Sequence, residues 1–233
     1  MVAGPTQQSE PIPVGALFEA AFRRFGARVS SYTLYSIAFA VPAAVAAFAV
    51  RDLAADRGTL ALSIFVACAG LGHFALAGTL TALVTGTLRR RFGQIAVAAA
   101  IGGLVSGMVF EVVGPFVLVL YPILVFASIA AAADAPAIGA FRVAVRLVVT
   151  DVGRTFAALV GLGLCAALLF FGFQVALSSV GGEAQIVATF ALTYLMLSPL
   201  AALVERNLYG DLTGRIVLPP TVDPQQRTRR GRR

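Results

Sequence analysis

The chain has 233 residues, of which 59% are hydrophobic and only 12% are charged, and its formal net charge is +7. Soluble domains average about 45–50% apolar and about 25% charged residues, so this composition excludes an ordinary soluble protein and favours one that lies in a lipid bilayer. All 18 basic residues are arginines, and long apolar runs separate them.

The apolar runs are typical of membrane-spanning helices rather than of barrel strands. They are rich in Ala, Val, Leu, Gly and Phe and do not alternate polar with apolar residues. A helix satisfies its own backbone hydrogen bonds in hydrocarbon, and about 20 residues are enough to cross it. We therefore expect an all-α bundle of six membrane-spanning helices. The expected spans cover residues 31–50, 59–88, 95–113, 116–133, 155–180 and 185–204.

The span count depends on residues 94–133, where the only charged side chain is Glu111. As one straight helix this segment would be ~60 Å long, about twice the hydrocarbon thickness. Gly114-Pro115 is the best turn, because Gly relaxes the backbone and Pro interrupts helical hydrogen bonds. Two crossings also place 16 of the 18 arginines on one side, as the positive-inside tendency requires. We predict that both termini are cytoplasmic.

Two amphipathic segments are too charged to span, residues 14–29 and residues 134–154. We expect both to be helices in the headgroup layer, with their arginines toward anionic lipid. A partner-docking role for the first helix is the alternative. The predicted apolar faces are Leu17, Phe18, Ala21, Phe22 and Phe25 in the first, and Ile138, Phe141, Val145, Val148, Val149 and Val152 in the second. The predicted headgroup-facing residues are Arg23, Arg24, Arg28, Arg142 and Arg146.

The two ends of the chain differ from this membrane domain, which covers residues 14–215. Residues 1–13 contain three prolines and no apolar core of a signal peptide, so we expect a disordered segment that is not cleaved. Residues 216–233 hold five arginines and three prolines, which predicts a disordered tail attracted to anionic headgroups. Only charge would favour nucleic-acid binding, so no nucleic-acid partner is expected.

Two ionisable side chains lie inside the expected spans. His73, the only histidine, should lie near the middle of the second span, where such a residue is a candidate for a proton or substrate role. A neutral imidazole can equally bond a neighbouring helix as a structural group. Glu111, three residues before the expected turn, either faces outside water or contributes to transport. We expect ~10 Å or more between the two along the membrane normal, too far for a direct pair.

Small residues in the spans favour close helix packing, with a flexible gate as the alternative. The cysteines lie inside spans without metal-ligand spacing, so we expect packing residues and neither a metal nor a cofactor. The predicted close-contact positions are Gly78, Ala82 and Gly86 in the second span and Gly103 and Gly107 in the third, and the cysteines are Cys68 and Cys165.

Three segments resemble one group of membrane proteins. Residues 15–26, GALFEAAFRRFG, resemble the opening of an uncharacterised group of six-helix proteins of bacteria and archaea, related to the membrane domain attached to some glycerophosphodiester phosphodiesterases. Residues 134–154 are similar to its cytoplasmic amphipathic helix, and Pro199 with residues 208–215 is similar to its closing pattern, with two departures. The resemblance implies six spans. It implies no enzyme activity, because these residues do not resemble the phosphodiesterase catalytic domain.

These features favour a non-catalytic, multi-pass protein of a bacterial inner membrane that acts through lipid or protein partners, for example in envelope homeostasis. The alternative is a transporter or permease subunit for a small solute or a lipid, which would need a polar cavity. A membrane enzyme is not expected, since no catalytic constellation is recognisable in the sequence.

Overall fold

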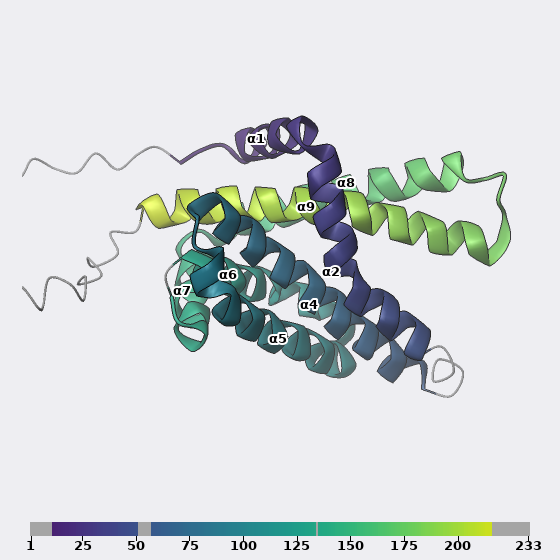
Figure 1. Ribbon diagram of the computed structural model, residues 1–233, viewed down its shortest axis with the longest axis horizontal. Coiled ribbons are helices and arrows are strands. Elements are labelled where there is room, and N and C mark those ends of the chain that lie inside the picture. The colour runs from purple at the N-terminus through teal and green to yellow at the C-terminus, as the bar shows by residue number, and fades with distance from the viewer. Residues whose placement is uncertain (1–10, 51–56, 134, 216–233) are drawn as a thin grey trace, which may run out of the picture.

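The computed structural model describes residues 11–50, 57–133 and 135–215, and all regular structure in these ranges is helical (Figure 1). The predicted all-α class is therefore confirmed. The predicted tail at 216–233 and most of the segment 1–13 lie outside the described residues. The helices are α1 Val14–Ala27, α2 Val29–Ala49, α4 Gly58–Thr85, α5 Leu88–Val113, the 3-10 segment η1 Gly114–Val119, α6 Tyr121–Ala133, α7 Ala137–Thr150, α8 Val152–Ala176 and α9 Gly182–Arg215.

Within the described residues, five helical stretches are long and apolar enough to cross a membrane, which is compatible with a multi-pass membrane protein. A sixth apolar helix, α6, has only 13 residues. The five stretches are Val29–Ala46, Gly58–Thr85, Leu88–Val119, Val152–Ala176 and Ala184–Gly214.

The chain reverses direction at Gly114, as the sequence predicts. Gly114 has a φ of +60°, a value that favours glycine, and it ends α5. Beyond it α6 runs back along α5. A hydrogen bond shows this course: the N–H of Ala137, just beyond the end of α6, donates to the side chain of Gln94, near the start of α5, at 2.8 Å. The 3-10 segment η1 connects the two helices, so α6 is shorter than the predicted span 116–133.

Several helix ends differ from the predicted spans. Helix α4 ends at Thr85 rather than at 88, since Gly86 takes a left-handed φ of +69°. Gly86 is thus a helix cap and not a packing position. Helix α9 continues eleven residues beyond the predicted end at 204, because Leu208 and Leu212 extend its buried face. These extra turns contact α1, since Asn207 forms hydrogen bonds with Leu17 and Arg24.

Helix α4 contacts α2, α5, α6 and α9, and its closest neighbour is α5. Glycines make this approach possible. A Cβ atom on Gly103 would lie 2.6 Å from the carbonyl oxygen of Ala67, and one on Gly107 would lie 2.7 Å from the carbonyl oxygen of Ser63. The close contact predicted for Gly103 and Gly107 is therefore confirmed. Gly78 is confined in the same way by Ile95.

Helix α7 has three faces rather than the two predicted. An alanine-rich face packs mainly against α6, an apolar face is exposed, and Arg142 and Arg146 lie exposed beside it. The sequence predicted only the last two faces, because alanine does not mark a core position as a large side chain does. The buried face comprises Ala137, Ala140, Ala144, Leu147 and Val148, and the exposed apolar residues are Ile138, Val145 and Val149.

Helix α1 lies along the last turns of α9. The Asn207 side chain donates a 3.3 Å hydrogen bond to the carbonyl oxygen of Leu17, and Leu17 and Ala21 are buried. A large part of the apolar face predicted to contact lipid therefore contacts protein, although Phe22 is exposed. At the same end of the molecule Arg154 donates a 2.6 Å hydrogen bond to the Asp211 carboxylate.

The hairpin of α8 and α9 extends away from the other helices at its loop end (Figure 1). Helix α8 contacts mainly α9, and large apolar side chains on it are exposed. These side chains include Val160, Leu164, Leu168, Phe171 and Val175. An exposed apolar surface of this length suits lipid as the surrounding medium.

Candidate functional site

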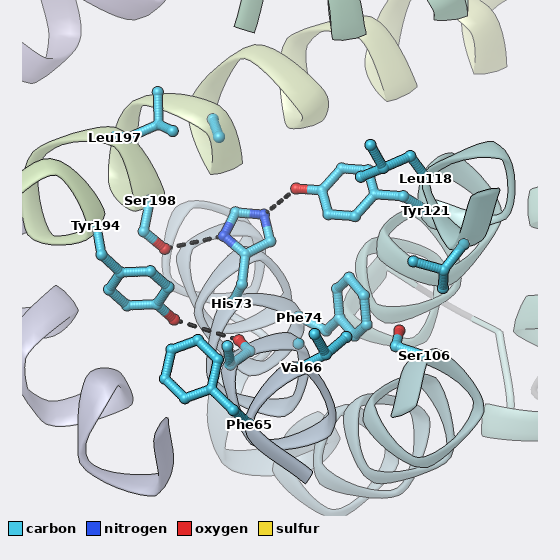
Figure 2. Close-up of a pocket in the computed structure, with 14 residues that line it drawn as sticks. Phe65, Val66, His73, Phe74, Ser106, Leu118, Tyr121, Tyr194, Leu197 and Ser198 are labelled. Carbon is cyan, nitrogen blue, oxygen red and sulfur yellow. Dashed lines mark hydrogen bonds between the residues drawn. The ribbon is translucent and has the colours of Figure 1, made fainter. Parts of the chain in front are cut away.

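His73 of α4 is buried in the middle of the bundle, and polar side chains from α6 and α9 surround its imidazole. Its Nδ1 lies 2.9 Å from Ser198 Oγ, and its Nε2 lies 2.7 Å from Tyr121 Oη and 3.1 Å from Glu205 Oε2. Tyr121 Oη in turn donates a 2.6 Å hydrogen bond to Glu205 Oε1. In Figure 2, Ser198 and Tyr121 reach the imidazole from opposite sides. We call these four residues the polar network.

Helical spacing brings the network together. Ser198 and Glu205 are seven residues apart on α9, so both lie on the face that contacts α4. Tyr121 is the first residue of α6, and the 3-10 segment before it sets where this helix begins. The Tyr121 and His73 rings are stacked with centroids 5.7 Å apart, and Phe74 contacts both rings. Packing therefore restricts the imidazole as well as its hydrogen bonds do.

The number of hydrogens on the Tyr121 hydroxyl and the His73 ring decides which groups of the polar network donate and which accept. Tyr121 uses its single hydroxyl hydrogen on Glu205, so its oxygen acts as an acceptor toward His73. A hydrogen on Nε2 then serves both Tyr121 and Glu205, and Nδ1 accepts from Ser198. A second hydrogen on the ring, at Nδ1, can also be accommodated, since the Ser198 hydroxyl can accept as well as donate. The imidazole ring can thus carry either one hydrogen or two without the movement of a heavy atom.

A cavity of about 280 Å³ adjoins the network on one side. Its walls are mostly apolar, and its polar side chains lie at His73, Ser106, Tyr121, Tyr194 and Ser198. The full lining is Phe65, Val66, Ala69, Gly70, His73, Phe74, Ser106, Val117, Leu118, Tyr121, Tyr194, Leu197, Ser198 and Ala201.

The rim of this cavity is apolar and exposed. Leu118 is 62% exposed and Phe65 is 38% exposed, whereas His73 at the inner end is 7% exposed. Phe65 and His73 are two helical turns apart on α4, so the cavity is ~12 Å deep along that helix. Its lining includes no arginine, so an anionic group would find no fixed cation there. The site therefore suits an apolar molecule that ends in an uncharged hydrogen-bonding group.

The order of Ser198, His73 and Glu205 is that of a hydrolase triad, but its surroundings do not suit acyl transfer. Such a reaction needs hydrogen-bond donors for the developing oxyanion. Ser198 lies inside α9, where backbone N–H groups are used in the helix, and the next residue, Pro199, has no N–H. Proton exchange and ligand binding fit this arrangement better. Among the described residues no three His, Cys, Asp or Glu side chains gather as a metal site.

Glu111, the other predicted intramembrane candidate, lies apart from the network. Its carboxylate accepts a 2.5 Å hydrogen bond from Ser63, which is ten residues before His73 on the same helix. Ten helical residues correspond to ~15 Å, so His73 and Glu111 do not pair, as predicted. The partner of His73 is instead Glu205.

Sequence reasoning missed both Glu205 and Tyr121. The predicted last span ends at residue 204, which leaves Glu205 outside it, and the predicted span 116–133 contains Tyr121 without giving it a role. A signal for Glu205 is present, since it shares a helical face with Ser198, Leu208 and Leu212. Nothing local in the sequence marks Tyr121.

The predicted headgroup-facing arginines all lie at the surface of the described structure. Arg142, Arg146 and Arg28 are exposed. Arg23 forms an exposed ion pair of 3.0 Å with Glu19, and Arg24 donates a 3.2 Å hydrogen bond to Asn207. Their contact with lipid stays a prediction.

No protein-family model matches the chain, and comparison with curated proteins and with solved structures finds no match. The resemblance to the six-helix group therefore stays a prediction, and the function has to be argued from the site.

Proposed function

We propose that the chain is a multi-pass membrane protein that takes an apolar, uncharged molecule from the bilayer into the cavity next to His73, without transforming it chemically. The observation that carries this proposal is the combination of an apolar, exposed rim at Phe65 and Leu118 with a polar inner end. A lipid-type chain that ends in a hydroxyl or carbonyl group fits this cavity, because its chain suits the apolar rim and its terminal group suits the polar inner end. The protein would then act through a lipid partner.

The proposed membrane arrangement has six spans, with both termini in the cytoplasm of a bacterial cell and the protein in its inner membrane. The antiparallel course of α5 and α6 supports it, since η1 and α6 together have 19 residues, about the length of one crossing. The distribution of arginines supports the orientation. Helix α7 would then lie at the cytoplasmic surface, with its exposed apolar face toward lipid and Arg142 and Arg146 toward anionic headgroups.

The test is retention of the ligand in native lipid nanodiscs, followed by mass spectrometry of the bound small molecules. Ala69 lines the cavity, so Ala69→Phe should fill it. Ala167 is exposed on α8, away from the cavity, so Ala167→Phe adds the same side chain as a matched control. We expect the wild type and Ala167→Phe to retain one apolar compound, and Ala69→Phe to lose at least nine tenths of it. Equal lipid profiles in all three proteins would contradict the proposal.

Transport of the bound molecule across the bilayer is the second candidate function. The specific observation in its favour is the polar network, because simple storage of an apolar molecule does not need a histidine and a glutamate that share a proton inside the bundle.

A further inference from the structure

The polar network separates two cavities. Besides the large cavity, a small one of about 10 Å³ lies among α6, α8 and α9, which is close to the space that one water molecule needs. His73 lines only the large cavity, Glu205 lines only the small one, and Tyr121 lines both. The imidazole and the carboxylate thus face different compartments, although they are 3.1 Å apart.

The two cavities lie toward opposite ends of the molecule. The large cavity extends to Phe65, in the first third of α4, and thus toward the end where α4 begins. The small cavity is lined by Thr155, in the first turn of α8, and by Leu208, near the end of α9. Leu208 follows Asn207, whose side chain bonds to Leu17 of α1, and α1 contacts both α8 and α9, so the small cavity lies toward the end of the bundle where α1 and the end of α9 meet.

Polar groups continue from the small cavity toward that end. The Thr155 hydroxyl donates a 2.9 Å hydrogen bond to the carbonyl oxygen of Asp151, one turn earlier. Arg154 links the carboxylates of Asp151 and Asp211 by contacts of 3.6 and 2.6 Å. Arg154 and Asp151 are partly exposed, so this group reaches solvent about one helical turn beyond the small cavity.

From this arrangement we propose that the polar network is a proton relay that carries protons between the large cavity and the small one. The relay rests on the proposed insertion in a membrane but does not depend on the proposed ligand. It assigns His73 and Glu205 as the two groups that hold the travelling proton, and Tyr121 and Ser198 as the residues that position the imidazole.

Each step of the relay is a proton transfer that leaves all heavy-atom bonds intact. When the large cavity holds water in place of its apolar ligand, a hydronium ion at the polar inner end gives a proton to Nδ1 of His73, and water remains behind. The imidazolium then passes its Nε2 proton to the Glu205 carboxylate, which becomes a neutral acid, and the ring is left with its proton on Nδ1. Glu205 releases its proton to water in the small cavity. The starting tautomer is restored by exchange with water of the large cavity while the ring is turned about its Cβ–Cγ bond. Nδ1 gives one proton to this water and Nε2 takes one from it, so the complete cycle moves one proton from the large cavity to the small one.

The surroundings of His73 contain the groups that this cycle needs. The ionisable side chains that contact it or share its cavity are Tyr121 from α6 and Glu205 and Tyr194 from α9. The other helices contribute uncharged groups to the cavity, such as Ser106 from α5. Glu205 is therefore the only carboxylate within hydrogen-bond reach of the ring in the described structure.

Proton flux into vesicles tests the relay. The full chain would be reconstituted in vesicles of phosphatidylethanolamine and phosphatidylglycerol that contain a pH-sensitive dye, and a potassium gradient with valinomycin would supply the driving force. We expect the wild type to raise the rate of internal pH change at least ten-fold above protein-free vesicles. His73→Gln and Glu205→Gln should return the rate to background. Glu111→Gln, which removes a carboxylate outside the network, should conduct as the wild type does.

The relay would be overturned if the wild type changed the internal pH no faster than protein-free vesicles do. It would also be overturned if Glu205→Gln conducted protons as fast as the wild type. Retained ligand without flux contradicts the relay alone, and flux without retained ligand contradicts the proposed function alone. Glu205→Asp keeps the carboxylate and should conduct above background, which separates loss of the proton carrier from loss of the fold.

A second measurement needs no substitution. His73 is the only histidine, so ¹⁵N-histidine labelling of a protein purified with a histidine-free tag gives the signals of one imidazole. We expect the ring N–H hydrogen to exchange with deuterium from the solvent within the time of the measurement, despite the burial of the ring. A ring N–H signal that persists in deuterated buffer as long as those of the buried backbone would show that His73 exchanges protons with neither side, and the relay would be wrong.

Discussion

Tyr121 Oη donates a 2.6 Å hydrogen bond to Glu205 Oε1, and this bond joins the first residue of α6 to α9 across 84 positions of the chain. Glu205 is 4% exposed, so bulk water offers its carboxylate little alternative to this bond. It therefore fixes the start of α6, which follows the irregular segment η1, against the helix that carries half of the polar network.

Removal of the Tyr121 hydroxyl should destabilise the protein modestly. Tyr121→Phe leaves a buried carboxylate oxygen without its donor, and side-chain hydrogen bonds in membrane helices contribute ~0.6–1.7 kcal/mol. Tyr35→Phe is the matched control, because Tyr35 on α2 is 38% exposed. Thermal unfolding in detergent should show a lower midpoint for Tyr121→Phe only.

The hydrogen bond between Tyr121 and Glu205 also predicts that these two residues are coupled energetically. In a double-mutant cycle with Glu205→Gln, the effects of the two changes on unfolding should not add, because each removes the same interaction. Additive effects would mean that Tyr121 and Glu205 contribute to stability independently.

A residue of this site could be predicted from the sequence only where its own sequence neighbours reveal it, and not where its role depends on contact with a distant segment. His73 was found because an ionisable residue stands out in an apolar run. Glu205 was missed because the span was ended by the length that hydrocarbon requires, whereas α9 continues to Arg215 against α1. Tyr121 meets His73 only through the packing of α6 on α4, and no local pattern contains that information.

The fold was predictable where a single residue type determines the local course of the backbone or the distance between two helices. Gly114 determines the reversal after α5, and Gly103 and Gly107 determine the close approach of α4. The faces of α1 and α7 were harder, since an apolar face serves lipid and protein equally well. Leu17 is buried by α9, whereas Ile138 is 83% exposed, and amphipathicity alone does not distinguish these two outcomes.

The glycines of α5 that face α4 should not tolerate even a methyl group. A Cβ on Gly107 would meet Ala67 Cβ and the carbonyl oxygen of Ser63, both at 2.7 Å, so Gly107→Ala has to push α4 and α5 apart. Overpacking of this kind costs about 1–3 kcal/mol. A Cβ on Gly163, on α8, would meet no such atom within 4 Å, so Gly163→Ala should be neutral or stabilising by up to about 1 kcal/mol. Equal unfolding midpoints for the two variants would contradict the tight α4–α5 contact.

The arginines of α7 should bind anionic lipid. Arg142 and Arg146 lie beside an exposed apolar face, and each basic residue near an anionic surface contributes about 1 kcal/mol. The double variant Arg142→Gln/Arg146→Gln should therefore release phosphatidylglycerol that native mass spectrometry detects on the wild type. Arg23→Gln removes a charge that Glu19 already balances, and it should release less. An unchanged lipid complement in the double variant would mean that this face of α7 contacts water or protein instead.

The crossing of α6 decides the topology of everything that follows it. If α5 and α6 form a membrane hairpin, α7 lies in the cytoplasm and the loop before α9 lies outside, whereas five spans would exchange these two positions. Cysteines at Thr150, the last residue of α7, and at Ala184, in the first turn of α9, distinguish the two arrangements, and both positions are exposed.

The measurement is labelling of intact cells with an impermeant thiol reagent, in a background with Cys68→Ala and Cys165→Ala. A cysteine at Thr59 is the reference, because the start of α4 lies outside in both arrangements. We expect Thr59→Cys and Ala184→Cys to react in intact cells and Thr150→Cys only after lysis, because Gly114 turns the chain back through the membrane. Labelling of Thr150→Cys but not of Ala184→Cys in intact cells would place α6 on the outer surface. The small cavity beside Glu205 would then face the wrong side for the relay.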